Sequence, residues 1–211
     1  MTVYLKIMNK KKYFLEIFKK AEKKYGNNPK RLAAEGWHSN WKTLVGIIMS
    51  AQSRDETTIQ IAKNLFKKYT KLIDLAEANL SDVKKVFRSL NYNNTKAKNV
   101  INTSKIILKD YKGRVPNTLD ELIKLPGVGR KTANLVLGEV YGKEAICIDT
   151  HCHRISNVLG LVKTKTPYET ELELQRIAPK RYWNKINRLF VLWGKDVPGR
   201  DKQRLIGYLK K

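Results

Sequence analysis

The chain has 211 residues, of which 43 are Lys or Arg and 19 are Asp or Glu, so its formal net charge is +24. A hydrophobic fraction of 42% is too high for a disordered basic tail, and we expect one or two folded domains that bind a polyanion. Two cysteines exclude a disulfide framework and a zinc or iron–sulfur site with four Cys ligands from one chain.

The hydrophobic periodicity is helical nearly throughout the chain, and no alternating run of strand length is present. The first apolar stripe ends at the turn 26–29, and Gly113 and Pro116 end the long stripe in the middle of the chain. Thr118 and Glu121 form a capping box that predicts a short helix. We therefore predict an all-α protein. The predicted helices cover residues 14–25, 41–50, 59–69, 97–111, 119–124, 130–140, 150–159, 168–177 and 183–193.

Targeting signals and membrane spans are not expected. The apolar runs are short, residues 44–49 being typical, and residues 1–12 carry charges and lack a long apolar segment. We expect no signal peptide, no transmembrane segment and a cytoplasmic location in a reducing compartment. The basic residues comprise 32 Lys and 11 Arg, which favours contacts with phosphates over reading of bases. A compositional bias or a thermophile's charged surface is the alternative explanation.

The most informative segment is residues 125–133, LPGVGRKTA, between the short capped helix and the helix predicted from Arg130. Pro126 ends the first helix, while Gly127 and Gly129 permit backbone angles and close approaches that a Cβ would block. The segment therefore predicts a hairpin between two helices. The first N–H groups of the second helix have no intrahelical partner and suit a phosphate. A purely structural turn is the alternative.

Lys131 falls in the first turn of the second helix of this hairpin. The macrodipole and the neighbouring Arg130 disfavour a charged amine there, which favours the neutral form. A neutral amine is the nucleophile that forms a Schiff base. The alternative is that Lys131 is an ordinary solvated lysine, one of 32 in the chain.

Asp149 lies in the segment CIDTHCHR, residues 147–154, and suits the N-cap of the next helix. A carboxylate held by backbone N–H groups stays ionised. It can stabilise a positive charge that develops on a sugar ring, or it can receive a proton. Capping alone is the alternative role.

The hairpin motif followed by the DTH motif resembles the helix-hairpin-helix DNA glycosylase superfamily, and most closely its endonuclease III branch. Other segments in the same order also resemble that branch, and the likeness spans residues 44–194. These segments are residues 48–52 (IMSAQ) with Asp55, 92–97 (YNNTKA), 113–116 (GRVP) and 192–194 (LWG).

The resemblance implies two α-helical lobes with a DNA-binding cleft between them. One lobe would be a helical bundle over residues 33–143 that contains the hairpin. The other would combine residues 1–32 with residues 144–211. Lys131 and Asp149 would then face each other across the mouth of the cleft.

The resemblance also implies a base-excision DNA glycosylase with abasic-site lyase activity on damaged bases in duplex DNA, oxidised pyrimidines being the expected substrates. A damaged nucleotide is flipped out of the stack, and Lys131 attacks its C1′ and expels the base. β-Elimination from the resulting Schiff base nicks the strand. Asp149 would support the cationic sugar and the proton transfers.

The same resemblance implies the DNA contacts. Gln52 would fill the space that the flipped base vacates. Tyr92 would stand where the branch often has an apolar wedge, or it packs within its own lobe. His151 and Arg154 would reach a phosphate or brace Asp149, with structural packing as the alternative. The hairpin would hold one strand through Leu125, Gly127, Val128, Gly129 and Arg130.

No cofactor is expected to be required, although the resemblance implies a possible Na⁺ or K⁺ ion on the backbone carbonyls of Ile123, Leu125 and Val128. The branch usually carries four C-terminal cysteines that ligate a [4Fe–4S] cluster. Here Pro198, Leu205 and Tyr208 take the first three positions, so we predict no iron–sulfur cluster.

The basic tail, residues 195–211, is expected to form a short amphipathic helix that contacts DNA in place of the cluster loop, or that only packs against Phe190 and Trp193. A zinc site is the other metal hypothesis, with Cys147, His151, Cys152 and His153 as ligands. It is disfavoured because an N-cap at Asp149 would break the helix between Cys147 and His151, and because the side chains of Cys152 and His153 would diverge by about 100°.

The sequence leaves two classes of alternative function open. Within the superfamily, the chain could be a glycosylase for mismatched uracil or thymine, or for 8-oxoguanine. Outside it, the chain could be a non-catalytic helix-hairpin-helix DNA-binding protein, for which the charge would suffice. We expect a monomer that binds double-stranded DNA containing a damaged base or abasic site, associates with the nucleoid and has no membrane partner.

Overall fold

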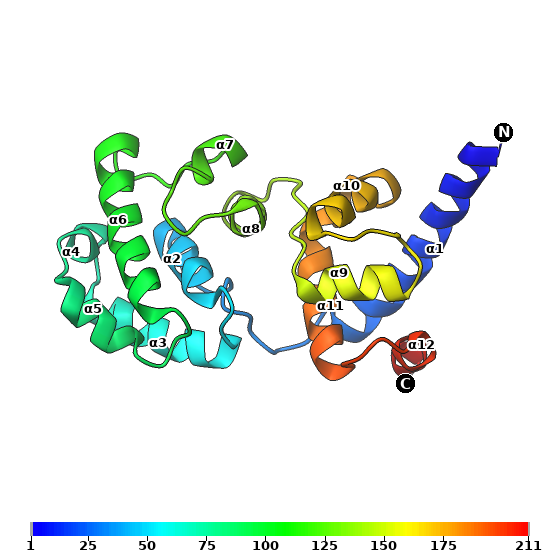
Figure 1. Ribbon diagram of the computed structural model, residues 1–211, viewed down its shortest axis with the longest axis horizontal. Coiled ribbons are helices and arrows are strands. Elements are labelled where there is room, and N and C mark those ends of the chain that lie inside the picture. The colour runs from blue at the N-terminus through cyan, green and yellow to red at the C-terminus, as the bar shows by residue number, and fades with distance from the viewer. Residues whose placement is uncertain (1, 211) are drawn as a thin grey trace. The chain divides into compact units, whose positions relative to one another are not determined.

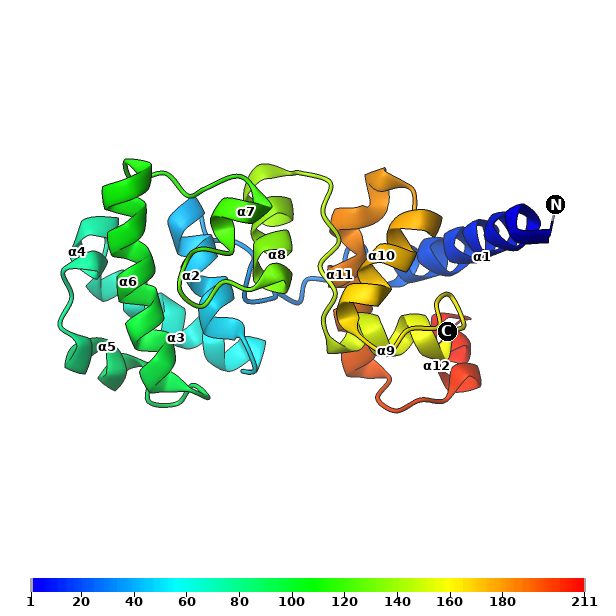
Figure 2. The same cartoon turned by 45° about the horizontal axis from the view of Figure 1, so that its top comes forward.

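A computed structural model describes residues 2–210, with side chains from residue 7 onward. All regular structure in this range is helical and no strand occurs there, which confirms the all-α prediction. None of the helices in this range combines the length and apolar character needed to span a bilayer. The chain divides into two compact units, residues 31–142 and residues 1–30 with 143–211. Figure 1 and Figure 2 show the helices of each.

The unit 31–142 is built around α2. This helix packs against α3, α6 and α8, so its residues Thr43 to Met49 are all buried. The long helix α6 packs against α4 and α5, as both views show. The helices are α2 (Asn40–Ser50), α3 (Asp55–Lys68), α4 (Leu72–Ala76), α5 (Leu80–Phe87), α6 (Asn93–Tyr111), α7 (Leu119–Leu122) and α8 (Arg130–Tyr141).

The unit formed by residues 1–30 and 143–211 is built around α11. This helix packs against α9 and α1, and Phe190 and Trp193 on it are fully buried. The opposing stripe on α1 carries Phe14, Phe18 and Tyr25, which are buried as well. The elements are α1 (Thr2–Tyr25), α9 (Thr150–Val158), α10 (Pro167–Ile177), the 3₁₀ helix η1 (Lys180–Tyr182), α11 (Trp183–Asp196) and α12 (Lys202–Lys210).

The C-terminal helix α12 packs against α1. Leu205 is completely buried and Leu209 is 9% exposed, which confirms the predicted apolar face of the tail helix. Lys24 of α1 lies 4.3 Å from the centroid of the Tyr208 ring. The hydroxyl of Tyr208 donates a hydrogen bond to Asp196 of α11 at 3.5 Å. Contacts of ordinary side chains therefore hold the last helix onto its unit.

Candidate functional site

The predicted hairpin joins α7 to α8. The Val128 N–H donates to the Leu125 carbonyl at 3.0 Å, which closes a tight turn, and both side chains are buried anchors. Gly127 has φ +79°, and a Cβ there would come within 2.8 Å of the Asn99 amide. The left-handed backbone and the lack of space for a Cβ therefore both require glycine at position 127. Gly129 has φ −92° and open space around the Cβ position, so its backbone is exposed without being strained.

The first turn of α8 has a geometry that suits an anion. Gly129 is the N-cap, no side chain caps the helix, and the first turn contains no acidic residue. The first N–H groups of a helix have no intrahelical partner and carry the positive end of the macrodipole. Arg130 and Lys131 are both exposed beside them. Within the part of the chain that the structure describes, no hydrogen bond or ion pair engages the Lys131 amine.

Asp149 is the N-cap of α9, as predicted. Its Oδ1 accepts the Cys152 N–H at 2.7 Å, and the residue is half-buried. This bond orients the carboxylate at the start of α9. Lys131 belongs to the unit 31–142 and Asp149 to the other unit.

Arg154 binds the end of α11 and the turn that follows it. Its guanidinium donates to the carbonyls of Gly194 at 3.0 Å and Val197 at 3.2 Å, and also to the Gly199 carbonyl. These bonds favour the packing alternative for Arg154, whose contact with phosphate stays a prediction. His151 lies against Gly194, where a Cβ would overlap its ring. Burial lowers the pKa of His151, while Asp149 opposes this shift.

Gln52 and Tyr92 both have left-handed backbones, which is unusual for residues other than glycine. Gln52 has φ +53° and Tyr92 has φ +57°, and both side chains are exposed, Tyr92 to 65%. The amide of Asn91 donates to the Gln52 carbonyl at 2.6 Å, so the two loops are direct neighbours. The structure therefore brings together the two residues for which an insertion role was predicted.

The two cysteines do not fit an iron–sulfur cluster. Cys147 and Cys152 are buried around Asn187, whose amide donates to the Cys147 carbonyl at 3.2 Å. Burial raises the pKa of the Cys152 thiol, which disfavours the thiolate that a metal would need. Among residues 2–210, no group of three His, Cys, Asp or Glu side chains could hold a metal ion.

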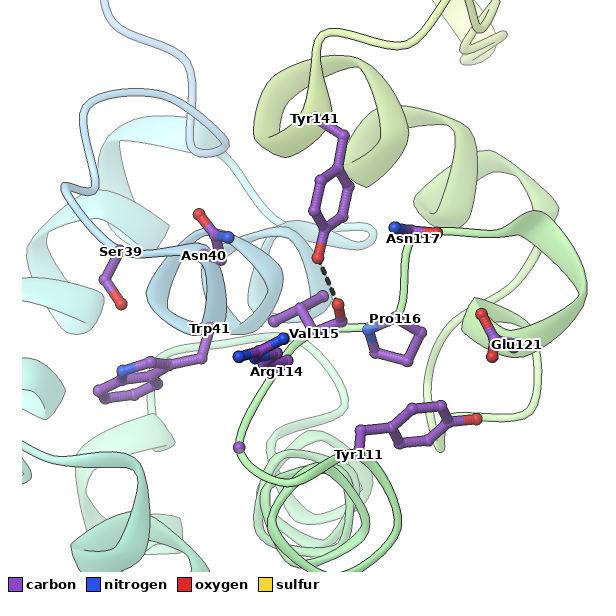
Figure 3. A pocket seen from close by; sticks show the side chains of 11 residues that line it. Ser39, Asn40, Trp41, Tyr111, Arg114, Val115, Pro116, Asn117, Glu121 and Tyr141 are labelled. Atoms are coloured by element: carbon purple, nitrogen blue, oxygen red, sulfur yellow. Dashed lines mark hydrogen bonds between the residues drawn. The ribbon is translucent and has the colours of Figure 1, made fainter.

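A cavity of about 550 Å³ lies in the unit 31–142, and none of the predicted site residues lines it. It is formed at the start of α2 and the ends of α6 and α8, whereas Gln52, Tyr92 and Arg130 lie at the opposite ends of these three helices. In Figure 3 the hydroxyl of Tyr141 points to the Val115 carbonyl, to which it donates a hydrogen bond. The lining residues are Ser39, Asn40, Trp41, Tyr111, Gly113, Arg114, Val115, Pro116, Asn117, Glu121 and Tyr141.

Sequence reasoning missed the side chains that hold the loops together. The Thr103 hydroxyl of α6 donates to the Pro126 carbonyl at 2.9 Å and thereby anchors the hairpin. The Lys96 amine donates to the Ser53 hydroxyl at 2.8 Å. Both contacts join residues far apart in the chain, and no local pattern indicates them.

Comparison with known proteins identifies the family of the chain. Residues 45–180 match the sequence model of one protein family, whose description is "HhH-GPD superfamily base excision DNA repair protein". Endonuclease III of Thermotoga maritima is 42% identical over 157 residues, which are 74% of this chain and 74% of that protein. Endonuclease III of Rickettsia conorii is 37% identical over 194 residues, which are 90% of this chain and 87% of that protein.

A solved structure of an endonuclease III trapped in a covalent intermediate with DNA is also similar. It superposes with a TM-score of 0.82 at 30% identity, and the match covers 88% of this chain and 86% of that one.

Proposed function

The chain belongs to the HhH-GPD superfamily of base excision DNA repair proteins, and on this premise we propose that it is a bifunctional DNA glycosylase and abasic-site lyase. It removes a damaged base from duplex DNA and then nicks the strand. The observation that carries the proposal is Lys131, an exposed amine in the first turn of α8 directly after the hairpin. A relative captured as a covalent intermediate with DNA supports an attacking protein nucleophile in this family.

DNA binding begins with the sugar–phosphate backbone. The exposed backbone at Gly127 and Gly129 and the positive end of the α8 macrodipole are suited to one strand's phosphates, as is the side chain of Arg130. The net charge of +24 adds a long-range attraction that does not depend on sequence. Gln52 and Tyr92 are proposed to enter the duplex where the damaged nucleotide leaves the stack.

The chemistry takes place at C1′ of the flipped nucleotide. The neutral amine of Lys131 forms a bond to C1′, and the glycosidic bond breaks so that the base leaves with its electron pair and takes a proton. The nitrogen loses a proton, and the sugar ring then opens as the C1′–O4′ bond breaks and O4′ takes a proton. The iminium ion that results acidifies the 2′ hydrogen. Loss of this proton breaks the C3′–O bond and releases the 3′ phosphate, after which water hydrolyses the Schiff base and regenerates the lysine.

Asp149 is proposed to act on the same nucleotide as Lys131. Its carboxylate stabilises the positive charge that develops on the sugar and receives protons during the two steps. The cap bond to Cys152 orients the carboxylate through Oδ1. His151, packed against Gly194, is proposed to brace the start of α9.

We also propose a substrate class, an oligomeric state, a location and a cation site. Oxidised pyrimidines are the proposed substrates, and the protein is proposed to act as a monomer at the nucleoid without an iron–sulfur cluster. The carbonyls of Ile123, Leu125 and Val128 are the proposed ligands of a monovalent cation, which would neutralise phosphate charge next to the hairpin. Exchange of K⁺ for Li⁺ would weaken DNA binding if this cation is present.

Nicking of defined duplexes tests the proposal. One duplex carries a single abasic site, a second carries thymine glycol, and an undamaged duplex of the same sequence is the control. The proposal predicts strand cleavage of the first two only. A protein that binds all three duplexes and cleaves none would be a non-catalytic DNA-binding module.

A further inference from the structure

Lys96 is a buried lysine outside the proposed catalytic machinery. It lies in the first turn of α6 and is 5% exposed, and no other lysine between residues 7 and 210 is buried. Burial lowers its pKa to about 8. A buried cation is unfavourable, and an apolar residue of similar size would fill the same space without that cost. A lysine at this position therefore needs an explanation beyond packing.

The contact that Lys96 makes is specific. Its amine donates to the Ser53 hydroxyl at 2.8 Å, across 43 positions of the chain. Ser53 immediately follows Gln52, and Lys96 lies one helical turn after Tyr92, whose carbonyl accepts the Lys96 N–H at 3.0 Å. The side chain thus joins the loop that carries Gln52 to the loop that carries Tyr92.

Each of the two loops contains a residue with a left-handed backbone, which is unfavourable without stabilising contacts. The Ser53 N–H donates to the Ser50 carbonyl at 3.0 Å, and Ala51 and Gln52 have the φ values of a type II turn, in which glycine usually occupies the Gln52 position. Tyr92 is also left-handed, at φ +57° and ψ +33°. Such conformations persist where the surroundings fix them, and they concentrate at functional sites.

Two side-chain links hold the loops together. One is the exposed bond from Asn91 to the Gln52 carbonyl at 2.6 Å, which water can compete for. The other is the part-buried bond from Lys96, which is 5% exposed, to the half-buried Ser53. A hydrogen bond from a charged donor is stronger than a neutral one in such surroundings. The bond from Lys96 is therefore the less solvent-accessible and stronger of the two links between the loops.

We propose that Lys96 is a positioning residue that clamps the Ser50–Ser53 turn to the start of α6, so that Gln52 and Tyr92 enter the DNA as one rigid pair. The inference rests on the proposed function, because it assigns a role in nucleotide flipping. Lys96 touches neither the substrate nor Lys131 in this account. Its loss should affect the extrusion of a base and spare the chemistry at C1′.

A comparison of two substrates separates these effects. A duplex with one damaged base requires extrusion and filling of the gap, whereas a single-stranded oligonucleotide with an abasic site requires neither. Lys96→Met keeps the volume and removes the amine. Lys98→Met is the matched control, because Lys98 is an exposed lysine one residue beyond Ala97 on the same helix and its loss changes the net charge equally.

We expect Lys96→Met to lower the single-turnover rate constant on the damaged duplex by at least tenfold, and to change cleavage of the single strand less than twofold. The fluorescence rise of 2-aminopurine placed beside the lesion, which reports unstacking, should slow in parallel. Lys98→Met should leave both substrates within twofold of the wild type. Ser53→Ala should likewise lower activity on the duplex and spare the single strand. Ser53→Thr, which keeps the hydroxyl, should retain duplex activity.

Three outcomes would overturn the inference. Lys96→Met could match Lys98→Met on the duplex, or it could lose both substrates equally, as a fold defect would cause. Alternatively, Ser53→Ala could retain full duplex activity with a normal unstacking signal. A wild-type protein that cleaves neither substrate would instead refute the proposed function, so the two failures are distinguishable.

Discussion

The hydroxyl of Thr103 donates a hydrogen bond to the carbonyl of Pro126 at 2.9 Å, and this contact ties the hairpin to the middle of α6. Thr103 has no exposed surface. The hairpin is otherwise held by the buried side chains of Leu125 and Val128. The bond from Thr103 therefore helps to fix the position of the hairpin that carries the exposed glycines.

Thr103→Val tests that contact. The shape is kept and the donor is lost, so the Pro126 carbonyl is left without its partner and the free energy of unfolding should fall by about 1–3 kcal/mol. Urea denaturation measures this change, and a filter-binding titration should show weaker DNA binding. Ser104→Ala is the control, because the equally buried Ser104 bonds only to the Val100 carbonyl of its own helix. Equal DNA binding by Thr103→Val and the wild type would show that the Thr103 bond does not position the hairpin for DNA.

The two hairpin glycines should respond differently to alanine. Gly127→Ala forces a left-handed alanine and brings its Cβ within 2.8 Å of the Asn99 amide, so unfolding should become easier by about 1–2 kcal/mol. Gly129→Ala has an ordinary φ and free space, and should change stability by less than about 0.5 kcal/mol. Thermal unfolding followed by circular dichroism compares the two variants. Similar destabilisation by both would contradict the geometry of the turn.

Asp149→Asn separates capping from catalysis, since asparagine caps a helix as well as aspartate does. The charge is lost while the bond to the Cys152 N–H can be kept. We expect the excision rate constant to fall roughly 100-fold or more while the melting temperature and the DNA affinity stay close to wild type. Loss of stability with activity retained would reduce Asp149 to a cap.

The lowered pKa of Lys96 predicts a dependence of stability on pH. Below pH 8 the amine is protonated in both the folded and the unfolded chain. Between about 8 and the ordinary value of 10.5, the unfolded chain binds a proton that the folded chain does not. The stability of the wild type relative to Lys96→Met should therefore rise as the pH increases from 8 to 10. Urea titrations at several pH values give this difference, and a flat difference would mean that the amine is solvated.

The long helices could be predicted from the sequence because each buries one regular stripe. Phe14, Phe18 and Tyr25 on α1 recur at helical spacing and are buried together. The short helices α4 and α5 were not predicted. Five residues in α4 and eight in α5 span too few turns for a stripe to stand out, and these helices depend on packing against α6.

The local parts of the candidate site were also predictable. The N-cap at Asp149, the start of α8 at Arg130 and the Gly127 turn follow from residue types and their spacing. The contacts of Lys96 and Thr103 were not, because each pairs residues more than 20 positions apart. In the sequence, Lys96 resembles one more exposed lysine near a helix start, and only the fold identifies it as buried.

Trapping with sodium borohydride tests the central role of Lys131 most directly. Reduction of the Schiff base links the protein irreversibly to a duplex that carries one abasic site, and gel electrophoresis with mass spectrometry of the linked peptide locates the bond. The account predicts an adduct at Lys131 in the wild type and in Lys124→Ala, a control variant of another exposed hairpin lysine, and none in Lys131→Ala, which should still bind the duplex. An undiminished adduct in Lys131→Ala would contradict the account.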